Sequence, residues 1–468
     1  MAQSTPRHIL LIGLEFVEPI FSGNGILTHS IVRGLLLLGY TVTVICAQPS
    51  SNSDQQVVVN NNCSVPSSFI SAVEQQLLHL LPVSVPSNLW KRLDKSSAWK
   101  EMAQCAPEVV SSSPNAKQLL QQDSFVFCID WSATSTYESL QQSKLLYPRT
   151  SHHLIHFVFR VFALSQEMFT SPNDWFFYRY HELRAIRQAE MTVVLSHVDQ
   201  KAIQQLLATE SQFQEESCPA ARENGKWNGT EVDLHVLVPP LRNDMLQLIQ
   251  EVQNSLSPSI ETPKRRYITC NVRLSPEKNA IAFAKSVRLL SDRGIFRQYN
   301  LQPLLIGPIC DEDYASRVRA ILPPETVLIT NFLQPKDLLV YMKQSILLVH
   351  PPVYDAYGMS IAEAAAVGTP SLIHYESIGA SSLFSVEKEE ILTSDMSCPF
   401  FVCRTLLCML EDQIDGIAYL SRIGTNAQHR ALAWTTLDYA KCVDIKLKQL
   451  SSLDEEREYA GLGAPSIP

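Results

Sequence analysis

Glycine is scarce in this sequence, and several features of other protein classes are missing. The 468 residues include 16 glycines and 27 prolines, about half the glycine expected from a usual frequency of roughly 7%. Lys and Arg number 38 and Asp and Glu 47, a net charge of -9, and the lack of a basic excess disfavours nucleic-acid binding. No apolar run approaches the roughly 18 residues of a membrane-spanning helix, so we expect no integral membrane segment.

The 11 cysteines are not arranged as a disulfide framework or a metal site. They stand singly, most of them within apolar segments, and no CxxC pair occurs. Their odd number argues against complete pairing. The first residues contain one Arg before a short apolar stretch and lack a small-residue cleavage site, so we expect no signal peptide. These features predict reduced thiols and a cytoplasmic location.

The composition is that of a globular protein, with 46% hydrophobic and 18% charged residues. This excludes disorder throughout the chain, and the length allows two or three domains. Residues 8–14 form a continuous apolar run, typical of a strand buried on both faces. Residues 26–38 have helical apolar spacing and residues 40–47 form a second apolar run. This strand–helix–strand order predicts a parallel sheet with a right-handed crossover.

Strands alternate with helices in both halves of the chain. Further strands are expected at 124–131, 152–163, 191–195, 235–241, 266–272, 302–308, 326–333, 346–352 and 369–375. The pattern predicts an α/β protein with two doubly wound, Rossmann-like domains facing a central cleft. We expect the first domain at 1–250 and the second at 251–430, joined through a polar linker at 251–265. A C-terminal helix is expected at 431–450, packing back on the first domain, and a loose tail at 451–468.

Two of the scarce glycines lie between the first strand and its helix. Gly23 and Gly25 flank Asn24 in this loop. Glycine allows a ligand to approach the backbone at a helix N-terminus, where free N–H groups favour an anion. An ordinary turn explains the same residues, because a lone GxG is a weak signal.

A second motif follows the strand expected at 266–272. Arg273 and Lys278 lie five residues apart at the carboxyl end of a parallel strand. Two cations placed there can converge on one pyrophosphate in the crevice of the sheet. The alternative is a pair of solvated loop charges.

The third motif, residues 351–364, is the most informative. Asp355 closes a strand-to-loop segment and Glu363 falls eight residues later on the following helix. Between them, Tyr357, Gly358 and Met359 form a turn and a helix N-terminus whose amides can bind phosphate. Glu363 lies among apolar neighbours and needs a polar partner, for which ribose hydroxyls are suited. A surface Asp and a capping Glu would explain each acid separately.

Together these motifs resemble those of the retaining nucleotide-sugar glycosyltransferases with the GT-B fold, specifically glycosyltransferase family 4. The resemblance rests on a glycine-containing first loop and its helix, a strand followed by R-L-x-x-x-K, a strand ending in G-P, and an E-A-x-A-x-G-x-P helix. The corresponding segments are SGNGILTHSIVRGLLLLGY, NVRLSPEK, LLIGP and HPPVYDAYGMSIAEAAAVGTP. The second half of the chain matches over most of its length, and the first half mainly at its opening unit.

The resemblance implies that the chain transfers a sugar from a nucleotide diphosphate donor to an acceptor. It places the donor on the second domain and the acceptor on the first. Arg273 and Lys278 would neutralise the diphosphate of the donor, which implies that neither a metal nor another cofactor is required. Glu363 would bind the ribose, and Asp355 would lie near the transferred sugar.

Further residues are assigned through the same resemblance. Tyr357, Gly358 and Met359 would offer backbone amides to the sugar and phosphates, and Gly23 and Gly25 would bring the first loop close to the donor. Arg160 is the positional match for a histidine that the family often carries on the acceptor side. His156 is interpreted instead as a packed strand residue.

Two alternatives remain open. The first alternative is a GT-B enzyme with another donor chemistry, such as a phosphorylase or an epimerase. No lysine can be singled out, however, as the anchor for the pyridoxal phosphate of a phosphorylase. The second alternative is a non-catalytic GT-B scaffold that binds a nucleotide sugar or a protein partner.

The triplet Asp311-Glu312-Asp313 looks like a metal-binding motif, but it opens a helix and is interpreted as a cap. The sequence identifies neither the acceptor nor the oligomeric state.

Overall fold

A computed structural model provides the structure of the chain. It describes residues 8–17, 20, 22–50, 66–86, 98–121, 124–146, 152–164, 171, 173–217, 232–242, 244–255, 265–375, 377–384, 389–411 and 416–461. Residues 51–65 and 218–231 and most of the linker 251–265 lie outside these ranges.

The first sheet has seven parallel strands. Their spatial order is β3 (Leu78–Pro86), β2 (Thr41–Ser50), β1 (His8–Gly13), β4 (Ser124–Ile129), β5 (His152–Val158), β6 (Met191–Val194) and β7 (Leu234–Val236). The helices of this half are α1 (Gly23–Leu37), α2 (Ile70–Glu74), α3 (Ala98–Ser111), α4 (Pro114–Leu119), α5 (Asp130–Gln142), α6 (Asn173–Gln188) and α7 (His197–Ser217). The first strand, helix and second strand confirm the unit predicted at residues 8–47.

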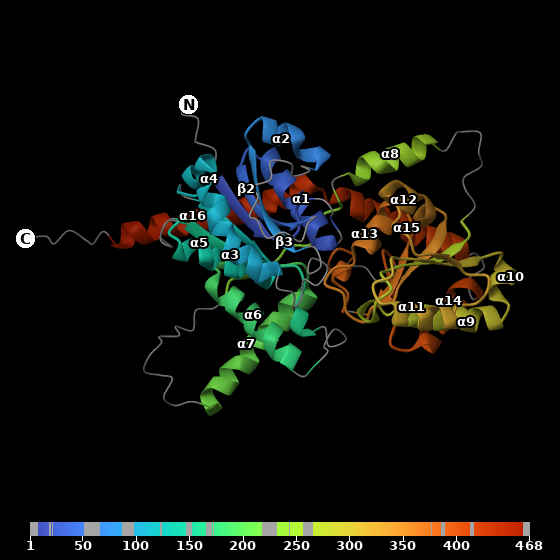
Figure 1. Cartoon of the computed structure of the whole chain (residues 1–468). Coiled ribbons are helices and arrows are strands. Elements are labelled where there is room, and N and C mark those ends of the chain that lie inside the picture. The colour runs from blue at the N-terminus through green and yellow to red at the C-terminus, as the bar shows by residue number, and fades with distance from the viewer. Residues whose placement is uncertain are drawn as a thin grey trace, which may run out of the picture.

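The second sheet has six parallel strands. Their order is β10 (Val327–Ile329), β9 (Gln302–Ile306), β8 (Tyr267–Asn271), β11 (Ser345–His350), β12 (Ser371–His374) and β13 (Leu392–Ser394). The helices are α9 (Ala280–Asp292), α10 (Ile295–Tyr299), α11 (Glu312–Ile321), α12 (Pro335–Lys343), α13 (Met359–Ala366), α14 (Pro399–Glu411), α15 (Gly416–Ala433) and α16 (Thr436–Gly461). The two parallel sheets and their helices form the two Rossmann-like domains that the sequence predicts (Figure 1).

One of the four buried apolar clusters among the described residues joins the two domains. The other three belong to single domains: one fills the face of the first sheet under α3, α5 and α6, and two lie within the second domain. The shared cluster begins between the first sheet and α1 and continues without a break to α13 and α16. Its members include Phe16 and Leu35 from the first domain and Ile361 and Tyr439 from later segments. Burial of this shared apolar surface favours a fixed contact between the domains.

The chain crosses between the domains twice. Helix α8 (Met245–Ser255) packs on α12 and α13 of the second domain (Figure 1), and the domain boundary at residue 250 stays a prediction. The two crossings contact each other. Trp434, on the way back to the first domain, donates its indole N–H to the carbonyl of Val238, on the way out, at 2.9 Å.

After this second crossing, α16 packs against α1. The Tyr40 hydroxyl donates to Asp444 at 2.6 Å. The helix continues to Gly461, beyond residue 451, where a loose tail is predicted to begin. Residues 462–468 lie outside the described ranges.

Each sheet changes its winding direction at one place. In the first sheet this switch point lies between β1 and β4, and in the second between β8 and β11. Ligands of doubly wound sheets bind beyond the carboxyl ends of the strands at this switch point. The motifs at Gly23, Arg273 and Asp355 all follow these strands, so the topology brings them toward one another.

The described helices and cysteines can be compared with the expectations of no integral membrane segment and of reduced thiols. Within the described ranges, none of the helices combines the length and apolar character needed to cross a bilayer. The nine cysteines in those ranges are all free.

We predict that His156 makes the stability of the first domain sensitive to acid. Burial in β5 lowers the pKa of His156 from 6.5 to about 4, while the unfolded chain keeps the ordinary value. Between pH 6.5 and 4 the unfolded state therefore binds the extra proton, and stability falls as the pH decreases. From pH 7 to pH 5 the wild type should lose about 1–2 kcal/mol more unfolding free energy than His156→Leu. Urea unfolding at both pH values measures this, and equal losses would contradict the prediction.

Candidate active site

An open cleft with a volume of about 370 Å³ lies between the two domains. Residues from the ends of β5, β8 and β11 and from the first turns of α1 and α13 line it. Nine of the ten residues selected from the sequence are among them: Gly23, Arg160, Arg273, Lys278, Asp355, Tyr357, Gly358, Met359 and Glu363. The structure thus brings together cations and acids that are far apart in sequence.

Gly25 is the exception. A Cβ atom on this residue would lie 2.7 Å from the Ile20 side chain and 3.0 Å from Oε2 of Glu15. The glycine therefore allows α1 to pack against its own preceding loop. Gly23, in contrast, faces the cleft, and a Cβ there would meet only Met359 of the second domain, at 3.5 Å.

The ion pair between Lys278 and Asp355, whose side chains are 15% and 11% exposed, lies at the switch point of the second sheet. Lys278 Nζ lies 2.7 Å from Asp355 Oδ2. Asn279, in the left-handed conformation, anchors the turn that carries Lys278, because its amide donates to the carbonyls of Pro351 at 3.0 Å and Met396 at 3.3 Å. The loops after β8 and β11 are thereby joined at their tips.

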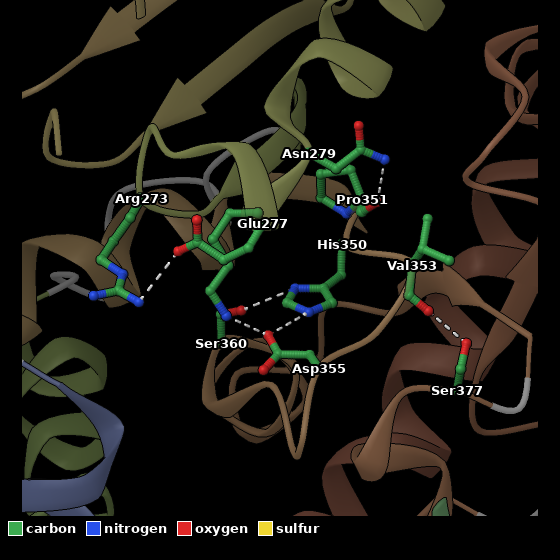
Figure 2. Close-up of polar contacts among 10 residues, drawn as sticks. Arg273, Glu277, Asn279, His350, Pro351, Val353, Asp355, Ser360 and Ser377 are labelled. Atoms are coloured by element: carbon green, nitrogen blue, oxygen red, sulfur yellow. Dashed lines mark hydrogen bonds and ion pairs between the residues drawn. The ribbon is translucent and has the colours of Figure 1, made fainter. Parts of the chain in front are cut away.

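His350 completes this cluster from the last residue of β11. Its Nε2 lies 3.2 Å from the same Asp355 oxygen, and its Nδ1 lies 3.5 Å from the Ser360 hydroxyl. Figure 2 shows the imidazole between Asp355 and Ser360. The ring thus fixes the acid that follows β11 relative to the first turn of α13.

Electrostatics keep Asp355 ionised. Burial alone would raise the pKa of Asp355, but Lys278 and the hydrogen bond and charge of His350 outweigh it and hold that pKa below its ordinary value. Burial lowers the pKa of Lys278, and Asp355 offsets part of this effect. A hydrogen-bonded pair of opposite charges is the arrangement in which both groups tolerate burial.

Arg273 also lines the cleft, and its ion pair is weaker than that of Lys278. Its nearest acidic partner is Glu277, at 3.6 Å, and its side chain is 39% exposed. Figure 2 shows Arg273 and Glu277 on one side of His350 and Asp355. A partly solvated guanidinium with a weak partner can bind an anion without first leaving a strong ion pair.

Glu363 has a protein partner that the sequence analysis did not identify. Arg242 Nη1 lies 3.6 Å from its carboxylate, and Arg242 also binds Asp244 through two nitrogens at 2.6 and 2.8 Å. Burial raises the pKa of Glu363, and Arg242 offsets this only in part. Arg242 lies at the first crossing between the domains. A donor that uses Glu363 must therefore share it with Arg242.

The first turn of α13 presents backbone groups to the cleft. Gly358 has a φ of +85° and precedes the helix, a conformation that favours glycine. A Cβ there would also lie 3.2 Å from His350 Nε2. Tyr357 is buried, and in the described structure its hydroxyl has no hydrogen-bond partner.

The first domain contributes Arg160, which follows β5. Its guanidinium lies 5.7 Å from the ring centre of Tyr354 and 5.9 Å from that of Phe162, distances typical of cation–π contacts. His156 is buried within the strand, as predicted.

Other polar side chains at this site carry weaker signals in the sequence. His350 and Arg242 stand beside the recognisable motifs, His350 at a strand end and Arg242 after two prolines.

Asp311 caps α11 by accepting from the Tyr314 amide at 2.8 Å, which confirms its interpretation as a cap. Within the described ranges, His, Cys, Asp and Glu side chains form no group of three that could hold a metal ion.

We predict that Asp355 is required for folding stability because it neutralises Lys278. Asp355→Asn should cost about 3–5 kcal/mol, since it leaves a buried ammonium without its counter-charge. Adding Lys278→Met should restore much of the loss. Glu312→Gln, which breaks an exposed ion pair to Arg319, should cost at most about 1 kcal/mol. Chemical denaturation measures all four proteins, and equal losses for the two acid substitutions would contradict this account.

Comparison with known proteins identifies a domain in the second half of the chain. Residues 253–393 match the family model described as glycosyl transferases group 1. No curated protein matches the sequence.

Several solved structures share the whole fold at low sequence identity. Sucrose-phosphate synthase from Thermosynechococcus elongatus is 13% identical with a TM-score of 0.64, and the match covers 96% of this chain and 100% of that chain. HepE from Anabaena, in complex with UDP and glucose, is 14% identical with a TM-score of 0.59, and the match covers 95% and 100%. A glycosyltransferase from Rickettsia africae is 12% identical with a TM-score of 0.58, covering 95% and 98%.

These similarities agree with the arrangement of the two sheets. The chain has the GT-B fold, and residues 253–393 form a glycosyltransferase group 1 domain, the domain of a glycosyl-transferring enzyme.

Proposed function

We propose that this protein is a retaining glycosyltransferase that moves a sugar from a nucleoside diphosphate sugar to an acceptor. The main support is the charge of the cleft. Four cations and two carboxylates line its described walls, a net charge of +2 in a chain of net charge -9: Arg160, Arg242, Arg273, Lys278, Asp355 and Glu363. A local positive charge in an acidic protein favours a polyanionic substrate such as a sugar diphosphate.

The proposal gives each wall of the cleft a role. Arg273 and Lys278 bind the diphosphate and stabilise the charge that develops when it leaves, so no metal is required. Glu363 binds the ribose, and Asp355 lies near the transferred sugar. Net retention follows if the acceptor attacks the face from which the diphosphate departs and the departing phosphate takes the acceptor proton.

The comparisons support the donor class. The Anabaena HepE structures contain UDP with glucose, or UDP-glucose, which makes UDP-glucose the first donor to test. Membership of glycosyltransferase family 4 is proposed from the motifs quoted above. A cytoplasmic location is also proposed, because the described cysteines are free thiols.

We predict that Arg273→Ala reduces turnover strongly and leaves the fold intact. Loss of one group that stabilises developing charge typically lowers kcat about 10²–10³-fold. Arg288→Ala is a matched control, because Arg288 also has an acid four residues later, Asp292, but lies on α9 outside the cleft. Release of UDP from UDP-glucose is measured with and without a chelator, which should not change the rate. Activity indifferent to Arg273→Ala would refute the mechanism, and no transfer from any nucleotide sugar would favour the scaffold.

We also predict that Glu363 and Arg273 contribute to different parts of donor binding. Thermal shifts with UDP and with pyrophosphate separate the two parts, since binding to the native state raises the melting temperature. Glu363→Gln should weaken UDP about tenfold and leave pyrophosphate unchanged, because only UDP has a ribose. Arg273→Ala should weaken both ligands. Arg242 keeps Asp244 as a partner in Glu363→Gln, so the variant should fold. An equal loss of both ligands in Glu363→Gln would contradict the ribose assignment.

A further inference from the structure

The segment from Phe159 to Ala163 leaves the first sheet at the end of β5 and borders the cleft. Phe159 and Arg160 line the cleft directly. Backbone N–H groups that leave a sheet lose their strand partners and must find others when they are buried. In this segment the amides of five consecutive residues are all held by side chains, with two buried carboxylates and one tyrosine hydroxyl as the acceptors. A third buried carboxylate, that of Asp199, binds the hydroxyl in turn.

Asp130 and Glu182 hold the two ends of the segment. Asp130 Oδ1 accepts from the Phe159 amide at 2.7 Å, and the same carboxylate has a backbone hydrogen bond from Arg160. Both oxygens of Glu182 accept from the other end, one from the amide of Phe162 and one from that of Ala163 at 3.2 Å. Asp130 begins α5 and Glu182 lies in α6, so two helices fix the segment.

The central amide is held from the second domain. The Val161 amide donates to the Tyr354 hydroxyl at 3.2 Å, and this hydroxyl donates to Asp199 Oδ1 at 2.8 Å. Tyr354 immediately precedes Asp355 in the sequence. The same tyrosine ring packs against the guanidinium of Arg160. The segment is therefore aligned with the loop that carries the acid of the cleft.

This arrangement costs free energy that a simple loop would avoid. The three carboxylates are at most 6% exposed. Burial raises the pKa of Asp130 and Asp199 to about 7 and that of Glu182 to about 8, despite the hydrogen bonds, and the charges of the neighbouring acids add to the effect. Buried polar networks of this kind rigidify a structure when every member is satisfied.

We propose that Asp130, Glu182 and Asp199 are positioning residues that hold the Phe159–Ala163 segment so that Arg160 enters the cleft beside Lys278 and Asp355. Arg160 then contacts the transferred sugar or the acceptor from the first domain. The inference rests on the proposed function, because it gives Arg160 a part in sugar transfer. Loss of the network should lower kcat and leave the KM for the donor nearly unchanged, since the diphosphate is bound by the second domain.

Two variants and a control test this on the full-length protein. Glu182→Gln replaces one acceptor oxygen with an amide that cannot accept, and Tyr354→Phe removes one bridging hydroxyl with little change of shape. Asp174→Asn is the control, since Asp174 is a buried carboxylate of α6 that binds Ser171. Hydrogen exchange followed by mass spectrometry reports on the peptide containing residues 159–163. UDP-glucose is the donor for steady-state turnover.

Both variants should raise exchange in this peptide at least about tenfold, as expected when a local opening costs less. They should lower kcat by about 10–100-fold, the scale of a misplaced catalytic group, with donor KM changed less than about twofold. Arg160→Ala should lower kcat similarly, and Arg160→Ala combined with Tyr354→Phe should be no worse than Arg160→Ala alone. Asp174→Asn should leave exchange in the peptide and turnover unchanged.

Three results would overturn the proposal. Unchanged exchange in both variants would show that the carboxylates do not hold the segment. Faster exchange with unchanged kcat, or additive losses in the double variant, would show that they do not position Arg160. Absence of turnover by the wild type with every nucleotide sugar is a failure of the proposed function instead, and exchange still decides whether the network holds the segment.

Discussion

The ion pair between Lys278 and Asp355 is the constraint on which the cleft depends. It joins the loops after β8 and β11, the two strands that flank the switch point of the second sheet. Loss of either partner leaves the other charge unpaired, so the ion pair, together with the hydrogen bond from the Asn279 amide to the carbonyl of Pro351, fixes the distance between the two loops. Arg273 and the first turn of α13 extend from these same loops. The positions of the groups that the proposed function assigns to the donor therefore depend on this contact between the two loops.

Much of the fold could be predicted from the sequence because both domains repeat one local pattern. A strand that is buried on both faces can be recognised in the sequence as an apolar run, as at residues 8–14. The strand β3 and the helix α3 were not predicted. Prolines interrupt both, Pro82 and Pro86 in the strand and Pro107 inside the helix, and proline is a local signal against regular structure. The tertiary contacts of β3 with β2 outweigh that signal.

The site was predictable to the extent that its residues belong to motifs at strand ends. Parallel strands bring their carboxyl ends to one edge, so Arg273 and Asp355 could be placed near each other without coordinates. Arg242 and Tyr354 could not, because their partners come from the other domain or from the crossing between the domains. Such contacts depend on the relative placement of two folded units, which no local pattern records. Gly25 lies outside the cleft lining, where the lack of a Cβ serves packing, and its assignment to the donor site stays a prediction.

The two walls of the cleft solve the problem of buried charge in different ways. On the second domain, opposite charges pair directly, as in Lys278 with Asp355 and Arg242 with Glu363. On the first domain, the carboxylates bind backbone amides and the Tyr354 hydroxyl. A direct ion pair can be reorganised when an anionic ligand competes for its cation, whereas acids that bind amides hold the backbone itself. Under the proposed function, the longer Arg242–Glu363 contact is thus suited to exchanging partners with a donor, while the opposite wall is suited to presenting Arg160 in a fixed place.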